Sequence, residues 1–490
     1  MNPPPPASAT SQAPDTPDTP ETPASPDNAL LQFRWERQPE ATRLVESVLE
    51  ELLAGSSFTR DLADRMRDDT GTRLFDWLDH LLVSADHAKA ANLPAKLIDH
   101  GFESQPVDTG ERYTHPGAIL PPIVISETVE PSIAIQVEDA ADFLACHQTR
   151  RGDDGLHAHL IGGPGQRMRC AAVRPTGDTV YATGIERHGW PDLESTRCPA
   201  DLILIAQGVY ESFLTRRRDF GVGQGADAAG FDHVNALIDD AFAKLDRDWA
   251  CDLFFAAERD YWMRRNRAGR EQYARQNRLG LGWANHDHHT YRSSRHNFAR
   301  LIGTFEKLGF FCRERFFPSP GAGWGAQVLE HPATGIVIFA DVDIDPHEVQ
   351  QDFAHMGLED RPDLKTVGLW CALHGDSMLQ AGMHHLEAQF DFDRLREQMK
   401  TEAGIEMMDP FSHWDHLKQQ FTQGEVWPVR PERVEALRSA GRIDDDAARR
   451  FLADGALGSH LENLERNDGY KGFNQTGITS VIEETDPRKW

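Results

Sequence analysis

The segment Trp283-Ala-Asn-His-Asp-His-His-Thr-Tyr-Arg292 gathers imidazole and guanidinium groups within one short stretch. On a β-strand successive side chains point to opposite faces, so the even-numbered side chains from His286 to Arg292 would share one face. A neutral imidazole is the commonest metal ligand, and a guanidinium beside it can pair with a carboxylate or phosphate. The segment therefore indicates a site where an anionic substrate meets a metal ion. The alternative interpretation is a His-rich loop without a ligand, because short His-rich tracts are only a compositional signal.

Composition places the chain among large, acidic proteins. Its 490 residues include 51 Lys plus Arg and 78 Asp plus Glu, for a formal net charge of −27. This acidity disfavours a polyanionic partner, so we expect no nucleic-acid binding. The six cysteines form no Cys-x-x-Cys pair, which suits a reducing compartment. Because neither a secretory leader nor an apolar run of bilayer length is evident, we predict a cytoplasmic protein without a membrane segment.

The N-terminal part of the chain divides into a tail and a folded region. Residues 1–28 are mostly Pro, Thr, Ser, Ala and Asp, a composition that cannot offset the entropy of ordering, so we predict a disordered tail. Residues 29–250 begin with helical periodicity around Leu44–Leu53 and continue as a mixed α/β region. A β-α-β-β-type module is suggested by a strand, a helix and a hairpin in succession, at Ile133–Val137, Ala140–Thr149 and Cys170–Ile185.

Two conspicuous motifs in the middle of the chain carry no function in this interpretation. The glycine cluster Gly221–Gly225 follows an apolar helix predicted over Leu202–Phe213 rather than a strand, so a linker is favoured over a nucleotide loop. The arginine-rich run Arg259–Arg278 is predicted to be a helix with a solvated or salt-bridged face.

The residues after Arg292 form a recognisable succession of elements. Helical periodicity over Phe298–Leu308 ends at Gly309, and three strand-like segments follow, Phe310–Phe317, Trp324–Glu330 and Gly335–Asp341. This strand-helix-three-strand order resembles one module of the vicinal-oxygen-chelate superfamily. The resemblance implies an α+β fold in which paired βαβββ modules curl into a half-open barrel around a metal held by His and Glu side chains.

A second module with its own histidine strand follows. Val367–Leu373 is predicted to be a strand, and Gly382-Met-His-His-Leu-Glu-Ala-Gln-Phe-Asp-Phe-Asp runs into a helix at Leu395–Met399. On such a strand His385 shares a face with Met383 and Glu387, whereas His384 points away from them. From the residues alone, either histidine is a candidate ligand.

A carboxylate is expected to complete the site, because two imidazoles and one carboxylate leave open positions for substrate and oxygen at Fe(II). The candidates are Glu425, Glu462 and Glu465. Glu425 lies in a short strand that ends in prolines, whereas the face of a charged helix explains Glu462 and Glu465 equally well. Context therefore favours Glu425.

From His288 onward the chain resembles the 2-oxoadipate dioxygenase/decarboxylase family of non-haem iron enzymes, over about residues 255–490. The resemblance is carried by His288-His-Thr-Tyr-Arg292, Met383-His-His385-Leu, Gly424-Glu425-Val with Val429-Arg-Pro, and Phe473-Asn-Gln-Thr-Gly477-Ile. It implies that His288, His385 and Glu425 bind the iron. It further implies that Arg292 binds a substrate carboxylate and that the Phe473–Asn474 loop touches the 2-oxo acid.

The implied protein is an Fe(II)-dependent dioxygenase that converts a 2-oxo acid and O2 into a hydroxy acid and CO2. Residues 251–490 would form its vicinal-oxygen-chelate-like catalytic domain. Two alternatives stay open: an isomerase, lyase or ring-cleaving dioxygenase on the same fold, and a non-catalytic metal-binding or scaffold protein. The oligomeric state is not predicted.

Overall fold

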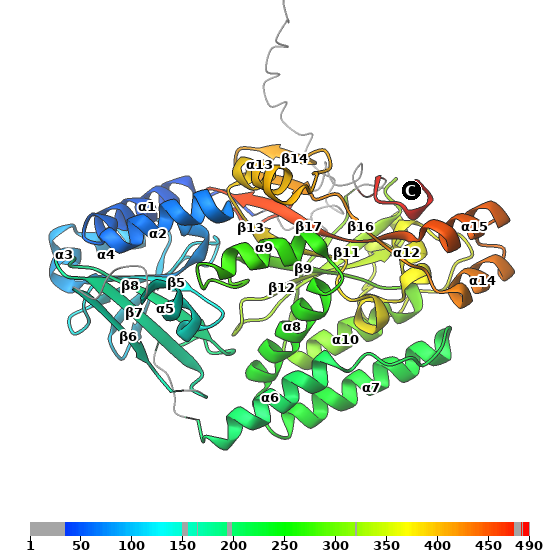
Figure 1. Ribbon diagram of the computed structural model, residues 1–490, viewed down its shortest axis with the longest axis horizontal. Coiled ribbons are helices and arrows are strands. Elements are labelled where there is room, and N and C mark those ends of the chain that lie inside the picture. The colour runs from blue at the N-terminus through cyan, green and yellow to red at the C-terminus, as the bar shows by residue number, and fades with distance from the viewer. Residues whose placement is uncertain are drawn as a thin grey trace, which may run out of the picture.

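The computed structural model describes residues 35–148, 155–163, 165–193, 198–318, 321–474, 482 and 484–489. The predicted disordered tail, residues 1–28, lies outside the described residues. Two β-sheets lie side by side, an N-terminal sheet coloured blue to cyan and a C-terminal sheet coloured green to red (Figure 1). Among the described helices none is long and apolar enough to cross a membrane.

The N-terminal sheet follows two amphipathic helices, α1 (Pro39–Ala54) and α2 (Ser57–Thr70). Its strand order is β2-β3-β4-β1-β5-β8-β7-β6. The strands are β1 (Leu78–Ser84), β2 (Glu103–Val107), β3 (Gly110–Thr114), β4 (Ile123–Ser126), β5 (Ser132–Gln136), β6 (Leu156–Ile161), β7 (Met168–Pro175) and β8 (Tyr181–Arg187). The helices between them are α3 (Ala85–Ala90), α4 (Leu93–Asp99) and α5 (Ala140–Gln148).

Four helices connect the two sheets: α6 (Asp201–Leu214), α7 (Gln224–Phe242), α8 (Arg247–Met263) and α9 (Arg267–Asn277). The arginine-rich run is therefore helical as predicted, but it is divided between α8 and α9. Asn266 is the N-cap of α9 and its side chain accepts a hydrogen bond from Gly269 N, which satisfies a free amide of the first turn. Helix α9 contacts both α2 and β17, so it bridges the two halves of the molecule (Figure 1).

The C-terminal sheet has the strand order β10-β11-β12-β9-β13-β17-β15-β14, and β16 pairs with β17 off this path. Its strands are β9 (His286–Arg292), β10 (Phe311–Phe316), β11 (Trp324–Glu330), β12 (Val337–Asp343), β13 (His385–Gln389), β14 (Ser412–Trp414), β15 (Leu417–Phe421), β16 (Glu425–Trp427) and β17 (Ala456–Arg466). Its helices are α10 (Phe298–Leu308), α11 (Pro346–Val349), α12 (Thr366–His374), α13 (Phe392–Ala403), α14 (Pro431–Ser439) and α15 (Asp445–Asp454).

Both sheets have the topology of paired βαβββ modules. In each sheet the first strands of the two modules, β1 with β5 and β9 with β13, run antiparallel at the centre. Each of these four strands also pairs in parallel with the last strand of its own module, β4, β8, β12 or β17. The predicted α+β fold of paired βαβββ modules is thus confirmed for the C-terminal half, and neither sheet closes. The N-terminal sheet repeats the same order, of which the sequence predicts only a β-α-β-β fragment.

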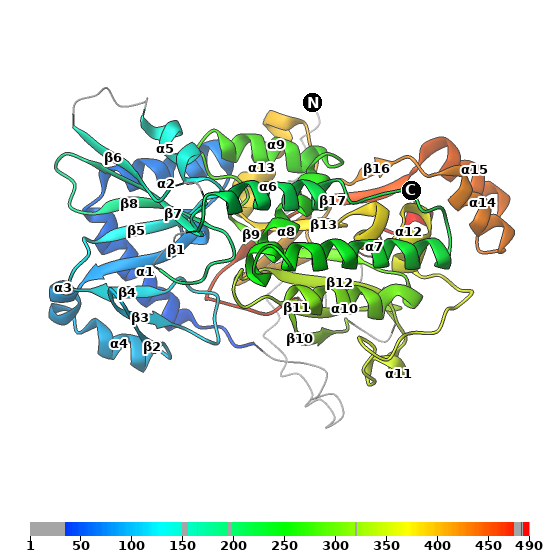
Figure 2. The same cartoon turned by 90° about the horizontal axis from the view of Figure 1, so that it is seen from below.

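Helix α10 shows how local sequence builds the main core. Its buried side chains recur at helical spacing, Phe298, Leu301, Ile302, Phe305 and Leu308. The helix ends where Gly309 adopts φ 113°, a left-handed conformation that a residue with a Cβ atom rarely adopts. Helices α6, α7, α8 and α10 together cover one face of the C-terminal sheet, as the view from below shows (Figure 2). The opposite face is left for the site described next.

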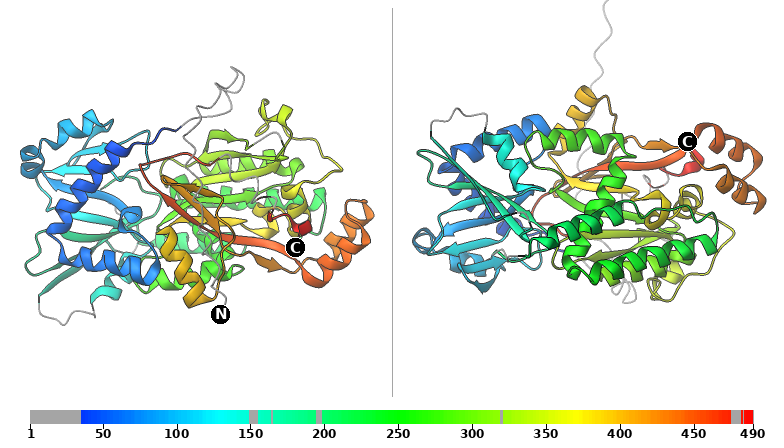
Figure 3. Two further views of the ribbon diagram at one scale, coloured as in Figure 1. Left: turned by 90° about the horizontal axis from the view of Figure 1, so that it is seen from above. Right: turned by 60° about the horizontal axis from the view of Figure 1, so that its bottom comes forward.

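Two predicted elements differ from the structure. The apolar run Val367–Leu373, predicted to be a strand, lies within helix α12, in which every residue except Ala372 is buried. A short continuous apolar run has no amphipathic period, so a buried helix and a buried strand look alike in sequence. Conversely, Glu462 and Glu465 lie not on a helix but on strand β17, in which every residue is buried. The α14–α15 hairpin, between β16 and β17, projects from the end of the C-terminal half that faces away from the N-terminal sheet (Figure 3).

Candidate metal centre

A β-bulge shapes the histidine strand. Glu387 on β13 is paired with His288 and the next residue, Ala388, with His286, so Asp287 is the extra residue in β9. The bulge allows neighbouring side chains to meet, and His288 Nδ1 lies 2.8 Å from Asp287 Oδ1. It also moves His286 off the face expected from simple alternation, because its ring packs 5.1 Å from that of His289 on the opposite side. The prediction that His286 shares a face with His288 is therefore wrong.

Three potential ligands converge at the centre of the sheet. His288, Glu387 and Glu462 come from three adjacent strands, since Glu387 pairs with His288 across β9 and with Glu462 across β17. One ligand atom from each lies within 4.8 Å of the others, and all three residues are buried. The fold thus brings His288 into a donor set that contains two carboxylates.

His385 adjoins this cluster. Its Nε2 lies 3.0 Å from Glu387 Oε1, and its Nδ1 lies 2.5 Å from His384 Nδ1. Glu387 Oε1 also accepts a hydrogen bond from Thr290 Oγ1 at 2.7 Å, and Glu462 Oε1 accepts one from Gln419 Nε2 at 2.8 Å. The carboxylates are therefore held in place by neighbours on the same face of the sheet.

Burial and mutual charge set the protonation of the cluster. Burial alone would lower the pKa of His288, but Glu387 and Asp287 raise it to about 10. Burial would raise the pKa of Glu387, but His288 and His385 lower it to about 2. For Glu462, burial and then the charge of Glu387 raise the pKa well above its usual value. The site therefore holds a charged His288–Glu387 pair beside Glu462, a carboxyl group that burial and Glu387 shift toward its neutral form.

This donor set fits a divalent cation. Glu387 Oε2 is buried and has no hydrogen-bond partner among the described residues. A buried carboxylate oxygen without a partner is costly, and a metal ion supplies the missing interaction. Imidazole and carboxylate ligands on one face are the donors that non-haem Fe(II) uses, although zinc accepts them too.

Aromatic side chains surround the cluster. Phe339 and Phe473 lie against the His288 ring, with ring centroids 5.9 and 5.1 Å away, and Phe316 and Trp324 extend the wall. The cavity between them measures about 20 Å³, close to the space of one water molecule. Asn474 also lines it, and the predicted contact loop beyond Asn474 lies outside the described residues.

Arg292 is completely buried two residues beyond Thr290 on β9. None of its guanidinium nitrogens has a hydrogen-bond partner among the described residues, and its Nε lies 3.7 Å from Asp341 Oδ2. Burial and Glu387 raise the pKa of Asp341 to about 7, although Arg292 opposes the shift. Asp341 lines the cavity, so an anion that enters beside it would meet an unsatisfied guanidinium.

Glu425 is not brought to His288. It lies on β16, which pairs with β17 at Ser459, and its Oε1 accepts a hydrogen bond from Arg267 N at 2.6 Å. Glu465 also has other partners, because its carboxylate accepts hydrogen bonds from Phe392 N at 2.9 Å and from Lys418 Nζ at 3.0 Å. Of the three carboxylates predicted as candidates, Glu462 is the one that reaches the cluster.

The sequence contained one signal for Glu387, which was not among the candidate ligands, and one for Glu462, which was a candidate but was not preferred. Glu387 follows His385 by two residues, so alternation alone places both on one face. Glu462 follows His460 by two residues in the same way. A strand pattern in both segments would have pointed to the pair.

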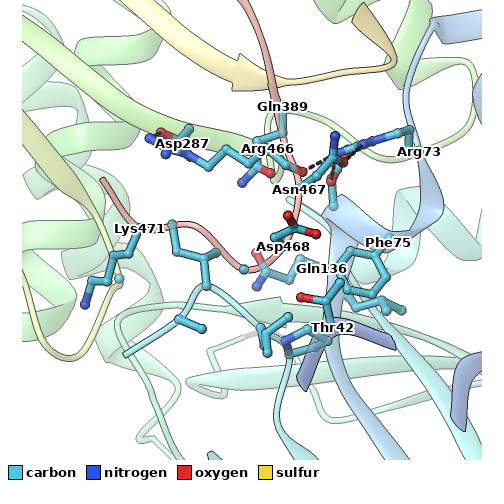
Figure 4. A pocket seen from close by; sticks show the side chains of 18 of the residues that line it. Thr42, Arg73, Phe75, Gln136, Asp287, Gln389, Arg466, Asn467, Asp468 and Lys471 are labelled. Atoms are coloured by element: carbon cyan, nitrogen blue, oxygen red, sulfur yellow. Dashed lines mark hydrogen bonds and ion pairs between the residues drawn. The ribbon is translucent and has the colours of Figure 1, made fainter. Parts of the chain in front are cut away.

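Behind the cluster, a polar pocket of about 600 Å³ lies between the two halves (Figure 4). Arg466, on β17, holds Asp287 with two hydrogen bonds of 2.7 and 2.9 Å. Arg73, from the N-terminal half, donates to Arg466 O at 2.8 Å. The support of His288 therefore extends through Asp287 and Arg466 to the domain interface.

A second group of possible ligands, Glu306, Cys312 and His355, lies near the surface. His355 Nε2 lies 2.9 Å from Glu306 Oε1, and its Nδ1 lies 2.9 Å from both carboxylate oxygens of Asp352. These ion pairs account for the grouping without a metal.

Comparisons with known proteins give distant structural likenesses. The sequence matches no protein-family model and no curated protein. A mutant of 4-hydroxymandelate synthase from Streptomyces coelicolor aligns at a TM-score of 0.24 and 12% identity, covering 84% of this chain and 98% of that chain. Methylmalonyl-CoA epimerase from Mycobacterium tuberculosis aligns at a TM-score of 0.22 and 11% identity, covering 38% of this chain and 89% of that chain. A xylose isomerase-like TIM barrel/4-hydroxyphenylpyruvate dioxygenase fusion protein aligns at a TM-score of 0.22 and 11% identity, covering 86% of this chain and 53% of that chain. Likenesses this distant carry no argument about activity, and the fold assignment rests on strand order.

Proposed function

We propose that this chain is an Fe(II)-dependent dioxygenase that oxidatively decarboxylates a 2-oxo acid, of the 2-oxoadipate type, to a hydroxy acid and CO2. The observation that carries the proposal is the buried convergence of His288, Glu387 and Glu462, with His385 beside them. The resemblance of the His288–Arg292, Met383–Leu386 and Phe473–Asn474 segments to the 2-oxoadipate family supports the choice of reaction.

His288, Glu387 and Glu462 would hold the metal, and His385 is the further imidazole within reach. Bound Fe(II) would supply the redox chemistry of oxygen activation and open positions for the 2-oxo acid and O2. Asp287 accepts the Nδ1 hydrogen of His288, which leaves Nε2 free to act as the metal ligand. The bulge in β9 is what brings this orienting carboxylate to the ligand.

Arg292 would bind the carboxylate of the substrate that lies farther from the metal. Its three buried guanidinium nitrogens without partners are costly unless an anion enters, and a carboxylate matches their planar fork. Asp341 stands 3.7 Å away and has a raised pKa, so it can be neutral when the substrate carboxylate arrives. A 2-oxo dicarboxylic acid is therefore favoured over a 2-oxo monocarboxylic acid.

The aromatic walls would exclude water from the reacting atoms. In the reaction the bond between the carboxylate and the keto carbon breaks, and CO2 leaves. One atom of O2 enters the new carboxylate and the other enters the hydroxyl group, so no further reductant is required. Phe316, Phe339 and Phe473 keep competing water from the cavity. Because the cavity of about 20 Å³ is smaller than any 2-oxo acid, a lining side chain such as Phe473 would have to move when substrate enters.

The test is oxygen consumption by protein purified without oxygen and reconstituted with one metal at a time. We expect Fe(II), and not Zn(II), to support O2 uptake with 2-oxoadipate, matched by equal CO2 release. 2-Oxohexanoate, which lacks the distal carboxylate, is the matched control and should be turned over at least tenfold less efficiently. Failure of every metal to bind, or turnover without O2 consumption, would overturn the proposal.

A metal-dependent isomerase is the second candidate, favoured by one observation. Two carboxylates, Glu387 and Glu462, face each other in the cluster, and the pKa of Glu462 is raised by burial and by Glu387. A carboxylate with a raised pKa is suited to remove a proton next to a carbonyl group. Isomerisation would proceed without O2 and with Zn(II), so the same experiment separates the two activities.

A further inference from the structure

The N-terminal sheet repeats the bulge at the corresponding place. On β1, Leu78 pairs with Ile135 and His80 with Ala134, so Asp79 is the extra residue, as Asp287 is on β9. His80 Nδ1 lies 2.6 Å from Asp79 Oδ1. The two halves therefore share an Asp-His pair on the first strand of the sheet.

The arginine that supports this pair is repeated as well. Arg187, on β8, donates to the two carboxylate oxygens of Asp79 at 2.7 and 2.8 Å. Arg466, on β17, makes the same two-point contact with Asp287. An Asp-His-Arg arrangement is thus present in both halves, built on equivalent strands.

The metal-binding carboxylates are not repeated. At the positions that correspond to Glu387 and Glu462, the N-terminal sheet has Ala134 on β5 and Thr183 on β8. A metal at His80 would have neither carboxylate, so the N-terminal site has a different chemistry. Its oriented imidazole instead faces a cavity of about 300 Å³, far larger than the space beside His288.

The hydrogen-bond role of His80 follows from its partner. Burial would raise the pKa of Asp79, but Arg187 and His80 lower it well below its usual range, so the carboxylate is ionised and only accepts hydrogen bonds. Nδ1 must then carry the hydrogen toward Asp79, and in the tautomer with Nδ1–H the other ring nitrogen, Nε2, is an acceptor. A ligand in the cavity meets this acceptor with an O–H or N–H donor.

The remaining lining defines the ligand further. The hydroxyl groups of Ser132 and Thr183 lie beside apolar side chains that include Leu82, Met168 and Ile185. Two arginines near the cavity are already engaged: Arg187 holds Asp79, and Arg174 pairs with Glu130 at 3.0 Å and lies 4.1 Å from the Tyr181 ring. Neither of these two arginines is therefore free to pair with a charged carboxylate.

We propose that the N-terminal cavity is a second ligand site, which binds a compact, uncharged, largely apolar molecule through a hydroxyl group that donates to His80 Nε2. A cavity of this size, mainly apolar and with a few convergent polar groups, has the character of a small-molecule site. The site does not depend on the metal centre or on the proposed oxidation.

Calorimetric titration of the full chain with 4-ethylphenol tests the proposal, with 4-ethylanisole as the matched probe that lacks the O–H donor. We expect the phenol to bind at least tenfold more tightly than the anisole. In His80→Leu the two probes should bind with about equal affinity. In His288→Leu, the equivalent substitution in the other half, the preference should remain while metal binding is lost.

Equal affinity of the two probes for the unaltered protein would overturn the proposal. So would a preference that is lost in His288→Leu and kept in His80→Leu, because the phenol would then occupy the metal centre. If His80→Leu does not fold, the decision falls to a crystal of the unaltered protein with 4-bromophenol. Its bromine should lie in the cavity beside Ser132 and Thr183, and a position elsewhere would contradict the site.

Discussion

Glu387 and Glu462 stand directly across from each other on the parallel strands β13 and β17, both buried and both within reach of His288. Two carboxylates in such proximity repel each other, and burial together with the charge of Glu387 raises the pKa of Glu462. The low pKa of Glu387 has another cause, because His288 and His385 lower it. A cation between them removes the repulsion. The arrangement is therefore costly without a bound cation and favourable with one.

The first prediction concerns which glutamate binds the metal. Glu462→Gln should reduce Fe(II) affinity at least tenfold, because an amide is a far weaker ligand than a carboxylate. Glu425→Gln is the matched control and should leave affinity unchanged, since Glu425 contacts Arg267 N and not the cluster. Metal content after dialysis measures both variants. If Glu425→Gln lost its metal and Glu462→Gln kept it, the ligand set predicted from sequence would be correct and this prediction wrong.

The second prediction concerns the support of His288. Asp287→Asn should weaken metal binding by roughly 10- to 100-fold, the usual effect of removing a group that orients a metal-binding histidine. Asp79→Asn makes the identical change at the repeated bulge and should leave metal affinity as it was. Competition with a chelator gives both affinities. Equal losses in the two variants would mean that the effect is one of general stability.

The third prediction concerns access to the cavity. Phe473 packs on the rings of His288 and Phe339, with centroids 5.1 Å away in each case, so it fills the space that a substrate needs. Phe473→Ala should lower KM for 2-oxo acids with longer chains. It should also raise the O2 uptake that is not matched by CO2 release, because water enters the opened site. Unchanged KM values across a series of chain lengths would show that substrate enters elsewhere.

How far sequence predicted this structure depends on how each element is buried. Helix α10 and strand β11 were predicted because their ends carry clear signals, such as Gly309. Strand β17 was missed because both of its faces are covered. It buries His460 and Asn463 as well as leucines, so it shows no alternation of polar and apolar residues.

The site was predicted in part for a related reason. His288 and His385 lie near the starts of strands that the sequence could place, and the structure brings both of them close to the same carboxylate, Glu387. Glu462 depends on a strand that was not predicted. The bulge at Asp287 depends on the pairing of β9 with β13, which no local pattern records. Register is a property of two segments together, and a single sequence shows each segment alone.

The last prediction concerns the contact between the two halves and its dependence on pH. His188 follows β8 and lies 2.7 Å from Glu186 Oε1 and 3.4 Å from Asp252 Oδ2 on helix α8. Burial would lower its pKa, but Asp252 and Glu186 raise it to about 9, above the unfolded value of about 6.5.

A raised folded pKa means that the folded state binds the proton more tightly than the unfolded state. The stabilisation from His188 is therefore complete below about pH 6.5 and is lost as the pH rises through about 9. Urea unfolding of the native protein and of His188→Gln should give free energies of unfolding that differ most at pH 6 and converge by pH 9.5. His87→Gln is the control, because the His87–Glu51 pair is half-exposed and such pairs contribute little. A difference between native and His188→Gln proteins that stays constant from pH 6 to pH 9.5 would show that the imidazole acts by packing on Trp249 and not by its charge.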